Sequence, residues 1–262
     1  MKRVIRFTRG IVPAAIFSVL LIAFGVVGYV VNGGFNMGVD FQAGVNQYVQ
    51  MAYPSFEVSY SGTQTATLEI TQTRATVVLA GTEDDNRTFE YDMEAYATIE
   101  AFASALAADG LSVAVRDGGS LPASLIVPTY RGAERLGPEP VVFSRVARDE
   151  NEIFSDSGTV RDALGGLGEL AVKSIGSKLD QQYVIRVADD GSNPNFGADV
   201  SARIRAGLAD AFGAERVVFM KTDFVGASFS KTLADNAWLL TTFTLLAILA
   251  YATIRFKFQY GL

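Results

Sequence analysis

Residues 157–220 read SGTVRDALGGLGELAVKSIGSKLDQQYVIRVADDGSNPNFGADVSARIRAGLADAFGAERVVFM and predict a helix, two strands, a second helix and a third strand. Apolar residues recur at helical spacing in two places, first at Val160, Ala163, Leu164 and Leu167, then at Phe196, Val200, Ile204 and Leu208. The segments 170–175, 183–187 and 216–220 have the alternation or the β-branched and aromatic content of strands. Gly213 is expected to end the second helix.

One strand upstream of this series would complete the order β-α-β-β-α-β, which is the ferredoxin-like arrangement. The candidate strand is 39–51. We therefore expect an α+β fold whose ferredoxin-like core is formed by 38–51 together with 158–223.

An inserted α/β module is expected between the two parts of this core, at about 52–157. Strands rich in Thr, Val and Tyr are predicted within 57–79, with turns at 61–62 and 72–73. A helix is predicted over 93–108 and a strand over 111–115. The segment 121–153 contains four of the seven prolines and scattered charges, which predict mainly loop.

Two apolar runs flank the core. The run 11–31 has 21 residues without a charge and the run 237–254 has 18, enough for helices of about 31 and 27 Å that could cross a bilayer. A cleaved signal peptide is the alternative for the first run, but the run is too long and no small-x-small cleavage site follows it. We expect two retained transmembrane helices.

The charge distribution predicts the orientation of these helices. The segments 1–10 and 255–262 carry basic residues and no acidic ones, so both are expected to lie in the cytoplasm. All 28 acidic residues and 16 of the 22 basic residues lie in 32–236, which has a net charge of −12 and is expected outside the cytoplasm. Such an acidic segment argues against a nucleic-acid partner.

The composition also restricts the possible chemistry. The chain contains no cysteine and no histidine, which excludes disulfides, thiolate metal sites and Ser–His or Cys–His nucleophile pairs. We expect no enzyme activity, no cofactor and no metal site.

A short motif follows the first apolar run: Gly38, Val39, Asp40 and Phe41, then Gly44 after two further residues. Glycines permit backbone conformations that other residues resist. From the residues alone, Asp40 is either a solvated or capping residue in a tight turn, or a proton or ion site at the membrane boundary.

This motif resembles a signature of the SecD/SecF family of protein-export membrane proteins, although Ala43 stands where the family usually has glycine. Phe224-Val225-Gly226 resembles a second family motif before the second apolar run, with Ala227 and Ser230 in place of a usual proline and glycine. Arg255-Phe256 resembles the family's ending of that run. The resemblance covers 1–51 and 158–262, is nearer to SecF than to SecD, and has no counterpart for 52–157.

The resemblance implies an accessory subunit of the Sec translocase in a bacterial inner membrane, which uses the proton-motive force to promote preprotein translocation. Its expected partners are SecD, the SecYEG channel with a YajC-type subunit, the unfolded preprotein and membrane lipid. The expected motif and hinge residues are Gly38, Asp40, Phe41, Gly44, Val225, Gly226, Arg255 and Phe256. The family's proton-relay charges lie in later spans, so none is assigned here.

Two other functions are open on the sequence. A sensor or receptor domain between two anchors would need a cytoplasmic signalling part, and only eight residues follow Ile254. An extracytoplasmic enzyme would need a Ser–Lys or carboxylate mechanism, for which there is no motif.

Overall fold

The computed structural model describes residues 11–31, 43–82, 85–189 and 191–256. The chain divides into two units, Met1–Gln42 and Ala43–Leu262. The first unit contributes helix α1 (Ile11–Val31), and the second contains all the other described elements.

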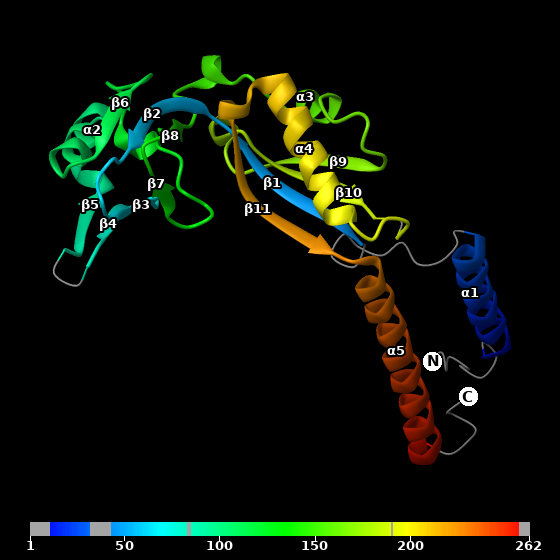
Figure 1. The fold of residues 1–262 in the computed structure, drawn as a ribbon. Coiled ribbons are helices and arrows are strands. Elements are labelled where there is room, and N and C mark those ends of the chain that lie inside the picture. Colours follow the sequence, from blue (N-terminus) through cyan, green and yellow to red (C-terminus); the bar gives the residue numbers. More distant parts are fainter. Residues whose placement is uncertain (1–10, 32–42, 83–84, 190, 257–262) are drawn as a thin grey trace, which may run out of the picture. The chain divides into compact units, whose positions relative to one another are not determined.

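A four-stranded antiparallel sheet in the second unit has the order β11-β1-β10-β9 (Figure 1). Its strands are β1 (Gly44–Met51), β9 (Leu170–Ile175), β10 (Gln182–Ala188) and β11 (Val217–Val225). Helix α3 (Ser157–Asp162) precedes β9, and helix α4 (Phe196–Phe212) precedes β11. The order predicted for 157–220 is therefore confirmed. The strand predicted at 39–51 is observed from Gly44, and 39–42 lie outside the described residues.

Both helices pack on one face of this sheet because they carry the apolar stripes seen in the sequence. Val160, Leu164, Val200, Ile204 and Leu208 meet the alternate residues Val45, Val49, Tyr183, Ile185 and Val187 in one buried core. Gly213 ends α4 with a φ of 90°, a value that favours glycine, so the predicted stop is confirmed.

The chain between β1 and α3 forms two further sheets and one helix. A three-stranded sheet has the order β6-β2-β8 and a four-stranded sheet the order β5-β4-β3-β7. The elements are β2 (Tyr53–Ser59), β3 (Thr65–Ile70), β4 (Arg74–Ala80), β5 (Arg87–Asp92), α2 (Ile99–Ala108), β6 (Ser112–Val115), β7 (Glu134–Leu136) and β8 (Val141–Arg145). Short 3-10 turns are η3 (Met93–Ala95), η4 (Ala123–Leu125), η5 (Glu150–Glu152), η6 (Lys178–Asp180) and η7 (Ala214–Arg216).

This inserted module, residues 53–145, has a buried core of its own. The Phe56 ring stacks on Phe143 at 5.3 Å between centroids and meets the edge of Phe102 at 6.0 Å. Aromatic rings contribute the largest burial per residue, so these contacts hold β2, β8 and α2 together.

The predictions for the module were incomplete in three places. The segment 121–153 is mainly loop, as predicted, but it also contains two strands that were not predicted: β7, which pairs with β3, and β8, which pairs with β2. The helix predicted over 93–108 begins only at Ile99, where Thr98 caps it. Strand β5 was not predicted, because it is an edge strand with mostly exposed, polar residues and shows no apolar alternation.

Helix α5 (Ala227–Phe256) follows β11 with only Gly226 between them and begins well before the apolar run at 237. Judged over the described residues, no helix combines the length and apolarity needed to cross a membrane.

Candidate functional site

The two predicted motifs meet at one end of the four-stranded sheet. Gly44 begins β1 and lies opposite Val225, the last residue of β11, and opposite Ala188 on the other side. Gly44 and Val225, which are far apart in the sequence, are therefore neighbours where the chain enters and leaves the sheet. Of the predicted motif residues, the structure brings together Gly44, Val225 and Gly226.

Gly44 is required there by its surroundings. Its φ is +153°, and a Cβ atom would collide with the backbone carbonyl oxygen of Val187 and lie 3.2 Å from the Cα of Ala188. These are backbone atoms of the neighbouring strand, so they cannot move aside without breaking the β1–β10 ladder. The close approach of two strands explains the glycine that the sequence shows.

Phe224 closes the same end of the sheet from the helix side. Its ring lies against the first turn of α4, because a Cβ on Gly197 would be 3.1 Å from Phe224 Cδ2. Half of Phe224 remains exposed, at 51%. Gly226 is less crowded, since a Cβ there would be 3.8 Å from the Phe224 ring, an ordinary contact.

A β-bulge interrupts β11 a few residues before this end. The pairing with β1 shifts register between Tyr48 and Val49. Gln47, which is buried, satisfies the irregular backbone: its Nε2 donates to the Lys221 carbonyl at 2.9 Å, and Thr222 Oγ1 donates to its Oε1 at 2.7 Å. A bulge bends the strand and increases its twist, so β11 is bent by construction just before it leads into α5.

Of the remaining predicted residues, three are outside the described part of the chain and two are at the far end of α5. Gly38, Asp40 and Phe41 lie outside the described residues. Arg255 is exposed in the last turn of α5, and Phe256 ends that helix.

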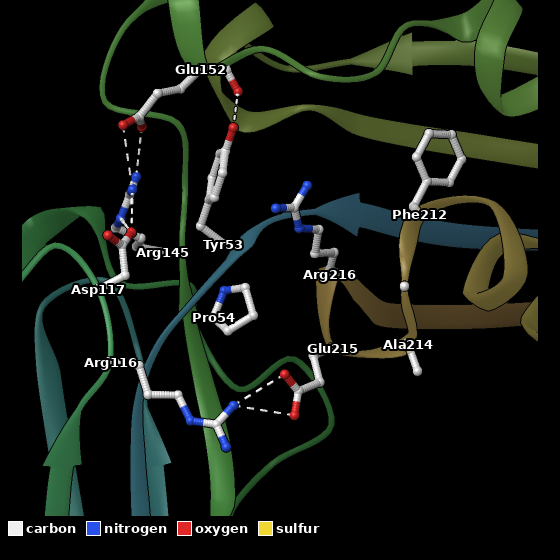
Figure 2. Close-up of a pocket in the computed structure, with 11 residues that line it drawn as sticks. Tyr53, Pro54, Arg116, Asp117, Arg145, Glu152, Phe212, Ala214, Glu215 and Arg216 are labelled. Carbon is white, nitrogen blue, oxygen red and sulfur yellow. Dashed lines mark hydrogen bonds and ion pairs between the residues drawn. The ribbon is translucent and has the colours of Figure 1, made fainter.

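A second feature is a cleft of about 650 Å³ between the inserted module and the four-stranded sheet with its helices (Figure 2). Arg145 of β8 lies in its wall, with a side chain only 4% exposed. Its guanidinium donates to Glu152 Oε2 at 2.7 Å and to Asp117 Oδ2 at 2.5 Å, and lies 4.7 Å from the centroid of the Tyr53 ring. The hydrogen bond from Arg145 lowers the pKa of Glu152 below its usual value, although burial opposes this shift.

Two further arginines join the module to the sheet across the cleft. Arg116, next to β6, forms ion pairs with Glu57 of β2 and with Glu215, which precedes β11. Hydrogen bonds to Glu215 and Glu57 raise the pKa of Arg116. Arg216 stacks near the Tyr53 and Phe154 rings, at 5.4 and 5.1 Å from their centroids. In the described chain, Asp117, Glu152 and Glu215 all pair with arginine, and the pairs of Glu152 and Glu215 join the inserted module to residues outside it.

Sequence reasoning missed this cleft. Its residues are 53–54, 116–117, 145, 152 and 212–216, and no local pattern links these positions. Only the folded chain shows that they share a wall. Over the described residues, no group of three acidic side chains is placed to hold a metal ion.

Comparison with known proteins agrees with the motifs. Residues 208–262, which include the end of α4, β11 and α5, match the family model for the protein export membrane protein SecD/SecF, C-terminal. The whole chain aligns with the protein translocase subunit SecF of Treponema pallidum (strain Nichols) at 27% identity over 288 residues, which is 67% of that protein. No solved structure matches the chain. The motif resemblance and these two matches agree: the chain is similar to the SecD/SecF family of protein-export membrane proteins and, over its whole length, to a SecF subunit.

Proposed function

We propose that this chain is a non-enzymatic accessory subunit of the Sec translocase, which acts with SecD beside the SecYEG channel and a YajC-type subunit. The observation that carries the proposal is the alignment of the whole chain with a protein translocase subunit SecF. In this proposal the domain outside the cytoplasm engages the unfolded preprotein, and the proton-motive force supplies the energy.

The four-stranded sheet with α3 and α4 is, in this proposal, a ferredoxin-like domain with an insertion at about 52–157. Its support is the strand order β11-β1-β10-β9 with antiparallel neighbours throughout. A β-α-β-β-α-β chain gives this order when the second and third strands pair as a hairpin and the first and last strands lie side by side.

The apolar runs 11–31 and 237–254 are proposed as membrane anchors, with both chain ends in the cytoplasm and 32–236 in the periplasm. Large apolar side chains are exposed on α1, such as Phe17 at 65% and Ile22 at 68%, and on α5, such as Phe243 at 73% and Ile248 at 59%. A helix that is apolar on all sides needs lipid or protein around it. The basic residues at both ends favour a cytoplasmic location for those ends.

This orientation predicts that a cysteine at Ser192 reacts from outside the cell membrane. Ser192 lies in the exposed loop between β10 and α4, and the chain has no cysteine of its own. Ser192→Cys should therefore react with an impermeant maleimide on intact spheroplasts, whereas a cysteine at Lys2 should react only after lysis. Labelling of the Ser192 variant only after lysis would contradict the orientation.

The route from α5 to the sheet suggests how helix motion would reach the domain. Only Gly226 separates β11 from α5, and β11 ends beside Gly44, where the chain from the first anchor enters. A tilt of α5 would act directly on an edge strand of the sheet. Gly226 is a suitable hinge because hinges are short segments that absorb the backbone change.

The export role predicts that Gly226→Val slows export of a periplasmic reporter in a strain that depends on this gene. The variant should accumulate normally, because a side chain at Gly226 meets only the Phe224 ring at an ordinary distance. Gly137→Val is the matched control, since Gly137 lies in the inserted module with nothing within 4 Å. Pulse-labelling of precursor and mature reporter measures the rate. Normal export without the gene would refute the export role itself.

A further inference from the structure

The described sheets have six edge strands, and five of them are short, covered, irregular or lined by charges. β6 and β7 have four and three residues. The edge of β8 is covered by 125–127, through hydrogen bonds such as Val127 N to Ser144 O at 2.8 Å. β11 carries the bulge, and β5 is lined by the exposed charges Arg87, Glu90 and Asp92. These are the usual means by which proteins prevent edge pairing.

Strand β9 differs from the other five. It is regular over Leu170–Ile175, contains no proline or bulge, and pairs only with β10. Its single charged residue is Lys173, and Ala171, Lys173 and Ser174 are exposed. Among the described residues, no backbone group is hydrogen-bonded to its outer edge.

The hydrogen bonds of β10 to its two neighbours show which N–H and C=O groups of β9 point away from the sheet. Ala188 N donates to Glu169 O, and Met51 N donates to Gln181 O. Even-numbered residues of β10 therefore bond to β9, and odd-numbered residues bond to β1. Because bonding alternates along an antiparallel pair, the N–H and C=O groups of Leu170, Val172 and Ser174 point outward from the sheet.

A cavity of about 820 Å³ adjoins the start of this strand. Residues 167–169, which lead into β9, line it together with Phe196 and Val200 of α4. It is a candidate pocket for a side chain of a segment that pairs with β9.

We propose that the outer edge of β9 binds an extended segment of unfolded polypeptide as a fifth strand. Strand addition takes its affinity from main-chain hydrogen bonds, with pockets adding a preference for particular side chains. Main-chain recognition suits a partner whose sequence varies, because every peptide unit except that of proline offers the same donor and acceptor. This inference rests on the proposed function, in which unfolded chains are the substrate.

The test uses the full chain in detergent and an uncharged, fluorescein-labelled peptide of alternating threonine and serine residues, which keeps charge attraction out of the measurement. Fluorescence anisotropy should show binding, and hydrogen exchange at Leu170, Val172 and Ser174 should slow when the peptide is present. Ser174→Pro removes one outward N–H without removing a bond to β10, and should weaken binding about tenfold, as expected for a lost hydrogen bond plus a steric block. Ser174→Thr keeps the N–H and should bind as the original chain does.

Hydrogen exchange is measured on the original chain, with and without the peptide. It therefore tests whether the peptide binds at β9 even if the Ser174→Pro variant folds poorly. Absence of peptide binding, protection at another edge, or equal binding by a folded Ser174→Pro variant would each overturn the β9 assignment. None of these results would affect the export role, which the reporter experiment tests separately. Slowed exchange at β9 together with the tenfold loss would support the inference.

Discussion

Gly44→Ala should lower the free energy of unfolding of the four-stranded sheet by about 2–4 kcal/mol, as expected for strain and overpacking at a site that cannot relax. The new Cβ would collide with the carbonyl oxygen of Val187, in the strand that pairs with β1. Urea unfolding of the full chain in detergent, followed by the fluorescence of the tyrosines, measures the change.

Two glycine controls separate the collision from other effects of the substitution. Gly213→Ala places a residue at a φ of +90° with nothing within 4 Å, so it should cost only the backbone strain, about 1–2 kcal/mol. Gly137→Ala has neither strain nor a close neighbour and should change stability by less than about 0.5 kcal/mol. If all three variants lost the same stability, close strand approach would not be the reason for glycine at Gly44.

Arg145→Met should lower the free energy of unfolding by about 2–3 kcal/mol, because it removes charge-assisted hydrogen bonds from a buried guanidinium. The expected loss stays below that of a fully buried ion pair, since Asp117 is 53% exposed and Glu152 19% exposed, so both regain water. Arg148→Met is the matched control. Arg148 is 54% exposed and also pairs with Glu152, at 3.6 Å, and its loss should change the stability much less, because solvent screens an exposed ion pair.

The same ion pair predicts a pH dependence with a defined sign. The pKa of Glu152 is lowered in the folded chain, chiefly by the hydrogen bond from Arg145. Its contribution to stability is therefore present above the ordinary glutamate pKa of about 4.3 and is lost as the pH falls through the lower folded value. Urea titrations from about pH 6 downward should show a steeper loss for the original chain than for Glu152→Gln. Parallel curves would contradict the role assigned to this carboxylate.

The order of elements in 157–220 could be predicted because local signals agree there. Apolar stripes mark the helices, Gly213 ends α4, and alternating strands flank a turn, and each signal depends on residues close in sequence. The inserted module was less predictable because its strands depend on residues that are far apart in the sequence. β8 becomes a strand by pairing with β2, more than 80 residues away, and the prolines at 138 and 140 concealed it.

The candidate site divides in the same way. Glycines at the strand ends could be noticed, because Gly44 and Gly226 stand in short motifs. The residues that lie opposite these glycines could not be predicted, since Gly44 is paired with Val225 only in the folded sheet. The cleft around Arg145 could not be predicted for a further reason, because the sequence does not show whether an arginine is buried or exposed. Its carboxylate partners Asp117 and Glu152 identify it only once the chain is folded.

The position of β1 between β10 and β11 also determines when the four-stranded sheet can form during synthesis of the chain. The inserted module is a continuous stretch with its own core, so it can fold soon after the ribosome has made it. β1, made earlier, stays without partners until 182–225 follow. Closing so long a loop delays the central pairing, and refolding should therefore show a fast phase from the module and a slower one from the sheet.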